Sequence, residues 1–140
     1  MKVFWSIIII LIVLGSIFFF YQKAESPVVE DTHADLIKVF SPRAEAVISS
    51  PLEVTGEARG TWYFEASFPV YLYDANGQEL AVTPAQAQGE WMTTEFVPFK
   101  ATLTFEKPST ATGTLVLQKD NPSGLPEHAD QISIPVRFSQ

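Results

Sequence analysis

From Leu36 onward, apolar residues alternate with polar ones, and this period of two constrains the fold more than any other feature. Leu52 and Val54, for example, alternate with Glu53 and Thr55. The pattern recurs in four further stretches, Phe68–Tyr73, Ala101–Phe105, Thr114–Gln118 and Ile132–Phe138. Neighbouring side chains of a strand point to opposite faces, so such stretches predict half-buried strands. No window after the N-terminal region has the apolar stripe of a long helix, and this part of the chain is therefore predicted to be all-β.

Turn residues separate these stretches at intervals of about 8–12 residues. The strongest signal is Asn76-Gly77, because a type I′ hairpin turn needs two residues that accept positive φ. The other signals are Ser41-Pro42, Ser50-Pro51, Gln88-Gly89, Lys107-Pro108 and Asn121-Pro122-Ser123-Gly124. About seven or eight short strands at this spacing predict an immunoglobulin-like sandwich of two sheets. Pro135 cannot donate a ladder hydrogen bond, so the last strand is expected to be an edge there.

An uncharged apolar run covers residues 3–21, with Lys2 before it and Lys23 after it. As a helix this run would be ~29 Å long, close to the thickness of a bilayer core. A cleaved signal peptide is the alternative, but its apolar core would be shorter and small residues would follow it. The chain is thus divided into an N-terminal membrane anchor (1–23) with one transmembrane helix, an acidic linker (24–35) and the sandwich domain (36–140).

The expected location is a single-pass membrane protein with its C-terminal domain outside the cytoplasm. The short N-terminal tail favours this orientation, and the positive-inside rule favours it slightly. The linker would span only ~20 Å as a flexible coil. A partner in or just above the same membrane is therefore expected.

Charge and cysteine content exclude several classes of function. Residues 24–140 carry 16 Asp and Glu against 7 Lys and Arg, a net charge of −9. Such a surface repels phosphate backbones, so nucleic acid is not an expected partner. The chain has no cysteine, which rules out disulfides, cysteine zinc sites and thiol nucleophiles. No cofactor is expected.

Several segments together resemble the immunoglobulin-like domain family found in bacterial spore-germination proteins. They occur in the family's order and cover most of residues 36–138. The segments are Ser49–Trp62, Glu65–Val70, Gln86–Trp91, Phe96–Phe99, Gly113–Leu117 and Lys119–Gly124. The resemblance implies a bacterial envelope protein with an immunoglobulin-like fold. It implies no catalytic or ligand-binding residues, and in germination proteins this domain accompanies another domain, which is not found here.

Catalysis is not expected from this sequence. The two histidines, His33 and His128, lie outside any nucleophile motif, and no G-x-S-x-G occurs. A calcium site could be drawn through Asp120, Asn121, Glu127 and Asp130, but the spacing does not match an EF-hand loop. Asp and Asn beside Pro and Gly are more typical of a turn. The prediction is therefore no enzyme and no metal site.

The segment from Arg59 to Glu65 contains three consecutive aromatic residues, which cannot all point inward from one strand. An exposed Trp62 or Tyr63 beside Arg59 would resemble an interface hot spot or stack on sugar rings. In the alternative interpretation Trp62 and Phe64 fill the core and Tyr63 lies over a neighbouring strand. The candidate binding residues are Arg59, Trp62 and Tyr63, with Asp120 and Asn121 in the polar loop.

Taken together, these features predict a membrane-anchored, noncatalytic envelope protein whose domain binds another envelope protein, with a link to sporulation or germination. Two alternatives remain open at the level of sequence. One is a module that binds the cell wall or a carbohydrate. The other is a structural spacer that associates with itself through an exposed edge strand.

Overall fold

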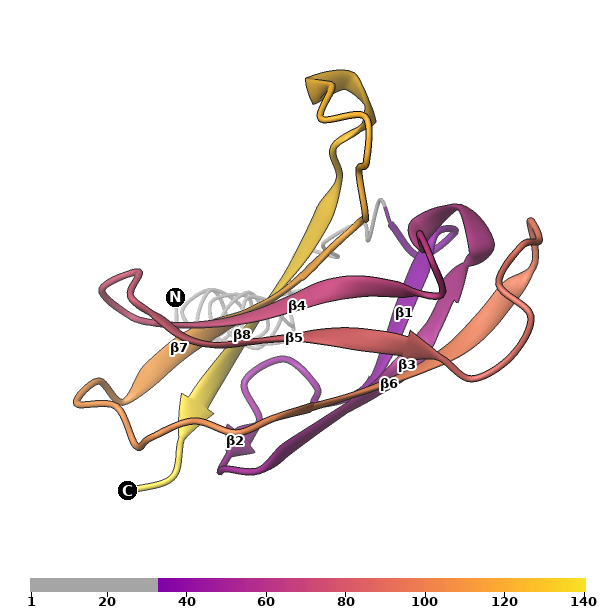
Figure 1. Ribbon diagram of the computed structural model, residues 1–140. Coiled ribbons are helices and arrows are strands. Elements are labelled where there is room, and N and C mark those ends of the chain that lie inside the picture. The colour runs from indigo at the N-terminus through magenta and orange to yellow at the C-terminus, as the bar shows by residue number, and fades with distance from the viewer. Residues whose placement is uncertain (1–32) are drawn as a thin grey trace, which may run out of the picture. The chain divides into compact units, whose positions relative to one another are not determined.

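The alternating stretches form strands in the computed structural model, which describes residues 33–140 (Figure 1). The strands are β1 (Ile37–Ser41), β2 (Val47–Ile48), β3 (Leu52–Arg59), β4 (Ser67–Asp74), β5 (Glu79–Ala87), β6 (Phe96–Leu103), β7 (Thr112–Gln118) and β8 (Gln131–Phe138). Within this part of the chain the only helical elements are two 3-10 turns, η1 (Gly60–Trp62) and η2 (Pro126–His128). The all-β prediction is confirmed, and the eight strands agree with the predicted number.

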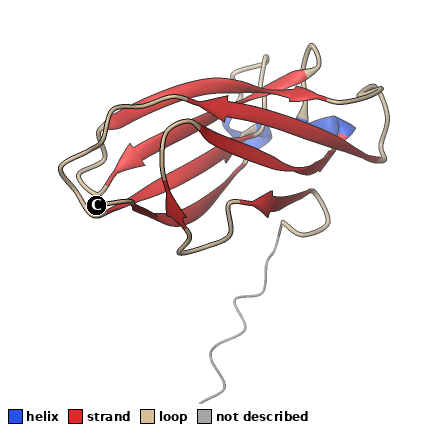
Figure 2. Ribbon diagram, turned by 90° about the horizontal axis from the view of Figure 1, so that it is seen from below, coloured by secondary structure: helices blue, strands red, loops and turns tan. Residues whose placement is uncertain are grey.

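The strands hydrogen-bond in a single order, β1-β3-β6-β5-β4-β7-β8-β2, rather than as the two separate sheets that were expected. β5 makes the connection. It pairs with β4 along most of its length, and near its end Gln86 and Ala87 pair with Lys100 and Phe99 of β6. The sheet folds over at this point, and Figure 2 shows the resulting two layers of strands. The sandwich is therefore one bent sheet whose layers remain joined.

Between the layers lies a core built from the inward-facing residues of the alternating pattern. The ring centroids of Phe68 on β4 and Phe99 on β6 lie 5.0 Å apart in an edge-to-face arrangement. Val54, Leu72 and Leu115 are completely buried around this contact. Burying a side chain of this size contributes roughly 1.5–3 kcal/mol, so the core accounts for a large share of the fold's stability.

The predicted membrane anchor lies outside the described residues. Among residues 33–140, no helix is long and apolar enough to cross a membrane. His33 and Asp35, which were assigned to the linker, already make contacts with the domain. The His33 Nε2 atom lies 2.7 Å from the Asp130 Oδ1 atom, and the His33 ring packs edge-on against Trp62 at 6.4 Å. The folded unit thus extends at least to His33.

The β4–β5 hairpin turns where Asn76-Gly77 predicted it, but with a different turn type. Only Gly77 has a positive φ, of 80°, whereas a type I′ turn would also need one at Asn76. The Asp74 amide donates to the Gln78 carbonyl, and the Gly77 amide donates to the Asp74 carbonyl. The turn is therefore longer than two residues, and the strand register shifts beside it, between Leu72 and Tyr73.

The Asp74 carboxylate explains this longer turn. Its Oδ1 atom accepts hydrogen bonds from the backbone amides of Asn76 at 2.8 Å and Gln78 at 2.9 Å. Asp74 is also the one charged residue that is buried among those the structure describes. Its side chain holds two backbone donors that no other side chain reaches in this turn.

We expect Asp74→Ala to lower the free energy of unfolding by about 1–3 kcal/mol, because both amides lose their acceptor. Asp74→Asn keeps an oxygen at the same position and should cost less. Urea denaturation of both variants measures the difference. Equal stability of the alanine and asparagine variants would contradict this role for the carboxylate.

The last strand is an edge over its first half, as Pro135 indicated. β8 pairs with β7 along its length, whereas β2 covers only Arg137 and Phe138 on its other side. At the boundary the Pro135 carbonyl accepts a hydrogen bond from the Glu45 amide at 2.7 Å. Pro135 thus lies at a position where the β7–β8 ladder does not require an N–H donor.

Candidate functional site

The Arg59–Phe64 segment leaves β3 through η1, and this turn decides which aromatic rings are buried. Trp62 is 1% exposed and Tyr63 is 4% exposed, whereas Phe64 is 41% exposed. The 3-10 turn breaks the alternation of the strand, so two consecutive rings enter the core. Trp62 is in the core, as the alternative interpretation predicted. That interpretation also placed Phe64 in the core and Tyr63 over a neighbouring strand, but Tyr63 is the buried ring and Phe64 the exposed one. A binding surface made of the Trp62 and Tyr63 rings is inconsistent with this geometry.

Tyr63 is anchored as well as buried. Its hydroxyl donates a hydrogen bond to the Val97 carbonyl at 2.6 Å, and its ring packs against Phe68 with a centroid distance of 5.2 Å. Burial raises the pKa of the Tyr63 phenol well above its usual value, so the group remains a neutral donor. Both the ring and the hydroxyl therefore serve the core.

Arg59 is held in place by contacts within the domain. Its Nε atom donates to the Asp35 carbonyl at 3.0 Å, and its Nη1 atom donates to the Thr94 carbonyl at 3.3 Å. The guanidinium also lies 4.0 Å from the centroid of the Phe96 ring. These contacts tie β3 to the β1 approach and to the loop before β6. The Arg59 side chain is thus oriented by its contacts within the domain.

Asp120 and Asn121 lie at the base of the β7–β8 arm, which projects from the sheet in Figure 1. The Asp120 amide donates to the Trp62 carbonyl at 3.1 Å, which joins the arm to η1. The Asn121 Nδ2 atom donates to the Leu125 carbonyl, and its Oδ1 atom accepts from the Ser123 hydroxyl. Asn121 therefore stabilises the loop through hydrogen bonds, as expected if this stretch is a turn.

Within residues 33–140, no group of three or more His, Asp or Glu side chains is arranged so that it could hold a metal ion. Asp130, one of the acids considered for calcium, is instead paired with His33. The candidate residues thus divide into two groups. Trp62, Tyr63 and Asp120 meet around η1, whereas Arg59 and Asn121 point elsewhere.

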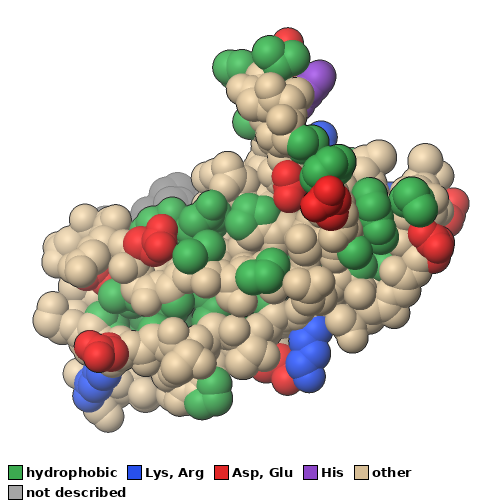
Figure 3. All heavy atoms as spheres, in the orientation of Figure 1, with side chains coloured by type: hydrophobic (Ala, Val, Ile, Leu, Met, Phe, Trp, Pro, Cys, Tyr) green, Lys and Arg blue, Asp and Glu red, His purple; other side chains and the backbone are tan. Residues whose placement is uncertain are grey.

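The outward face of the β5–β4–β7–β8 layer is the more distinctive surface, and sequence reasoning did not single it out. Paired positions across it are Pro69 with Pro84, Tyr71 with Val82, and Val116 with both Tyr71 and Ser133, none of them charged. Figure 3 shows hydrophobic side chains spread over this side of the molecule with few charged ones between them. We refer to these residues, together with Tyr73, as the tyrosine face.

The two tyrosines of this face are stacked. The rings of Tyr71 and Tyr73 lie 5.9 Å apart with an interplanar angle of 16°, and Val82 beside them is 51% exposed. Burial raises the pKa of Tyr73, as do the neighbouring Glu79 carboxylate and Tyr71. Tyrosine hydroxyls are protonated at neutral pH even without such a shift. The face therefore presents aromatic and aliphatic groups with neutral hydrogen-bonding tips. The apolar character of both sides of Phe68–Tyr73 is the sequence signal that could have revealed it.

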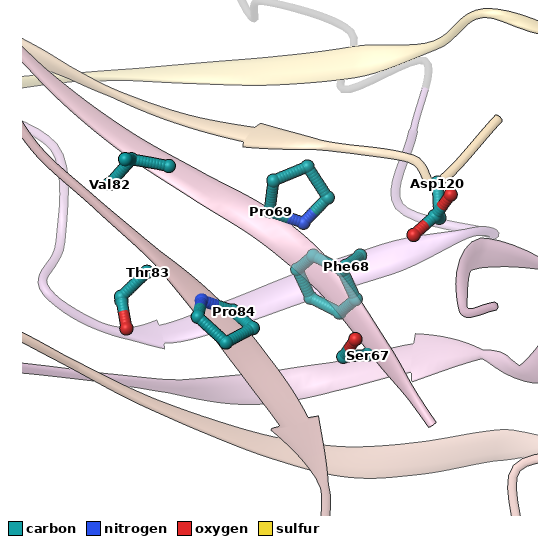
Figure 4. Close-up of a pocket in the computed structure, with 7 residues that line it drawn as sticks. All are labelled: Ser67, Phe68, Pro69, Val82, Thr83, Pro84 and Asp120. Carbon is teal, nitrogen blue, oxygen red and sulfur yellow. The ribbon is translucent and has the colours of Figure 1, made fainter. Parts of the chain in front are cut away.

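One end of the tyrosine face is hollowed. A shallow depression of about 380 Å³ lies between Pro69 of β4, Pro84 of β5 and Asp120 of the arm (Figure 4). Ser67 and Thr83 supply hydroxyl groups to its lining. Asp120 thus contributes a carboxylate to the rim of the tyrosine face, and it is the one predicted site residue that lies there.

With the fold and these surfaces defined, the chain can be compared with known families. The model of the immunoglobulin-like domain of bacterial spore germination matches residues 36–125, which is more than half of the chain. The chain belongs to this family. The match runs from the residue before β1 into the loop between β7 and β8, so it covers seven of the eight strands.

The resemblance noted from the sequence is therefore confirmed. Comparison with the curated proteins and with the solved structures gave no match. The family supports the immunoglobulin-like description of the bent sheet, and the link to spore germination comes from the family as well. It assigns no chemistry to any residue described above.

Proposed function

We propose that this chain is a noncatalytic protein-binding module of the bacterial envelope with a role in sporulation or germination. Residues 3–21 would hold it in the membrane, and the domain would lie outside the cytoplasm. Membership of the spore-germination family supports the biological setting. The tyrosine face supports the binding activity.

The composition of the tyrosine face carries the argument for a protein partner. The centres of protein interfaces are depleted of charge and enriched in aromatic residues. Tyr71, Tyr73 and Val82 have this character, in a domain whose sequence has a large excess of acidic residues. A stacked pair of tyrosines also offers a large contact area at low cost in side-chain entropy, since each ring has few rotatable bonds.

Charge would select among partners. Acidic residues border the face at Glu79 and Asp120, and residues 24–140 carry a net charge of −9. A partner with an apolar patch surrounded by basic residues would be attracted and oriented by this field. Its association rate should fall as salt concentration rises.

A photoreactive amino acid introduced at Val82 tests this proposal in cells that produce the full chain. We expect it to cross-link to one discrete envelope protein. The same group at Thr102, an exposed position on the outward side of β6, serves as the matched control and should not form that product. Cross-linking that is equal at both positions, or that yields glycan or a second copy of the chain, would overturn the proposal.

Val82→Lys should weaken the captured interaction at least tenfold, because the ammonium group would have to be desolvated in the centre of the interface. The free energy of unfolding should change by less than about 0.5 kcal/mol, since the side chain is exposed. Thr102→Lys should affect neither quantity. The measurements are affinity for the purified partner and urea denaturation. An unchanged affinity of the Val82→Lys variant would exclude this face as the binding surface.

A further inference from the structure

A second groove lies on another part of the domain, where the chain crosses from β1 to β2. These two strands stand at opposite ends of the sheet order, and residues 42–46 connect them. Figure 2 shows β1 and the loop that follows it along one border of the molecule. The groove has a volume of about 470 Å³, and its lining includes Phe40, Pro42, Arg43, Val47 and Pro51. It shares no residue with the tyrosine face.

The lining of this groove is largely polar but includes two exposed apolar side chains. Phe40 is 55% exposed and Val47 is 68% exposed, which makes them two of the most exposed large apolar side chains among those the structure describes. Both belong to strands at the ends of the sheet order, each of which has a neighbouring strand on one side only. Pro42 and Pro51 restrict the backbone on either side, which keeps the groove in a defined shape.

Arg43 gives the groove its charge. No hydrogen bond or ion pair to the Arg43 side chain occurs within residues 33–140. Four other cations of the same region, by contrast, pair with carboxylates: Lys38 with Glu57, Arg59 with Glu95, Lys100 with Glu53 and Arg137 with Glu45. The acid nearest to Arg43 in the sequence, Glu45, is thus already paired. In a domain with an excess of acids, Arg43 presents an available guanidinium.

The backbone of β2 offers the third element of recognition. The carbonyls of Ala46 and Ile48 accept hydrogen bonds from Arg137 and Ser139, so they point toward β8. Backbone groups of successive residues alternate in direction along a strand, and those of Val47 therefore point away from β8. Among the described strands, β2 has no neighbour on that side. Its amide and carbonyl form a short open edge beside the groove.

We infer that this groove binds an extended peptide segment of a partner protein that carries a carboxylate next to a bulky apolar side chain. The segment would add to the free edge at Val47, place its apolar side chain against Phe40, and pair its carboxylate with Arg43. Strand addition of this kind obtains affinity from backbone hydrogen bonds and specificity from side-chain pockets. The guanidinium suits a carboxylate because it can donate two parallel hydrogen bonds. This site goes beyond the proposed function and does not depend on the tyrosine face.

A random octapeptide library displayed on phage tests the inference, with the full chain in neutral detergent as the target. We expect enriched peptides to share an Asp or Glu within two positions of an aromatic or large aliphatic residue. The most enriched peptide, synthesised with a fluorescent label, should bind the Arg43→Gln variant at least tenfold more weakly. Lys107→Gln is the matched control, because Lys107 also has no ion pair among the described residues but lies outside the groove. That variant should bind the peptide like the unaltered chain.

Two further measurements identify the mode of binding. Exchange of the Val47 amide hydrogen should slow when the peptide is bound, and the Val82→Lys variant should bind it normally. No enrichment, peptides without an acid, or equal binding by the Arg43→Gln variant would each overturn the inference. A dimer of the unaltered chain that Arg43→Gln dissociates would also overturn it, since a second copy would then occupy the groove.

Discussion

Replacing Trp62 with alanine is expected to lower the free energy of unfolding by about 3–5 kcal/mol. The side chain is 1% exposed, and its ring packs edge-on against Phe68 at 6.5 Å and against His33 at 6.4 Å. Removing the indole would leave a cavity at the junction of η1 with both layers. Domains of this size are stable by about 5–15 kcal/mol, so the loss is a large fraction of the total. Urea denaturation of the full chain measures it.

Phe64→Ala is the matched control, because Phe64 lies two residues away and is 41% exposed. The unfolding free energy of this variant should change by less than about 1 kcal/mol, since a large part of the Phe64 side chain already meets water. A Trp62→Ala variant that keeps full stability would contradict the placement of this ring in the core. It would return Trp62 to the set of candidate ligand-binding residues.

Gly113→Ala should lower the free energy of unfolding nearly as much, because the added methyl group overfills the site instead of leaving a cavity. A Cβ atom at this position of β7 would lie 2.4 Å from the Tyr73 backbone oxygen and 2.6 Å from the Phe138 ring. Tyr73 belongs to a strand with neighbours on both sides, so its backbone has little room to move. Overpacking of this kind typically costs about 1–3 kcal/mol, and a rigid backbone contact places it at the upper end. The midpoint of urea denaturation should fall accordingly.

Gly89→Ala provides the comparison. At this position a Cβ atom would meet only the Val97 side chain, at 4.0 Å, which is an ordinary contact. That substitution should leave the stability within about 0.5 kcal/mol of the unaltered chain. Equal stability of the two alanine variants would contradict the close packing of Gly113 against Tyr73 and Phe138.

Much of the fold could be predicted because its signals are local. The alternation of Leu52 with Glu53 or of Ile132 with Ser133 reports on which face is buried, whatever the topology. The pairing of Gln86 and Ala87 with β6 could not be predicted from local signals, since it depends on how far β5 extends before the sheet bends. The turn type at Asn76-Gly77 was missed because the dipeptide rule leaves out the Asp74 side chain, which accepts hydrogen bonds from the amides two and four residues further on.

The candidate binding residues were less predictable than the strands. The sequence indicates that three consecutive aromatics cannot share one face, but only the η1 turn determines that Tyr63 rather than Phe64 is buried. The tyrosine face had a visible signal, because Tyr71 and Tyr73 occupy the positions that alternate with the core residues of β4. That Arg43 is a basic residue is evident from the sequence, whereas its lack of an ion pair within residues 33–140 depends on the positions of every nearby acid.

The pairing of β2 with β8 also governs when the domain can be completed during synthesis. Val47 and Arg137 are 90 residues apart in the chain, and β2 has no other partner among the described strands. At about 5–20 residues per second, the ribosome needs roughly 5–18 s to produce the second strand after the first. The final ladder therefore closes only after Arg137 and Phe138 have been synthesised. A polypeptide terminated before Gln131 would leave Ile48 exposed and the domain open to quality-control proteases.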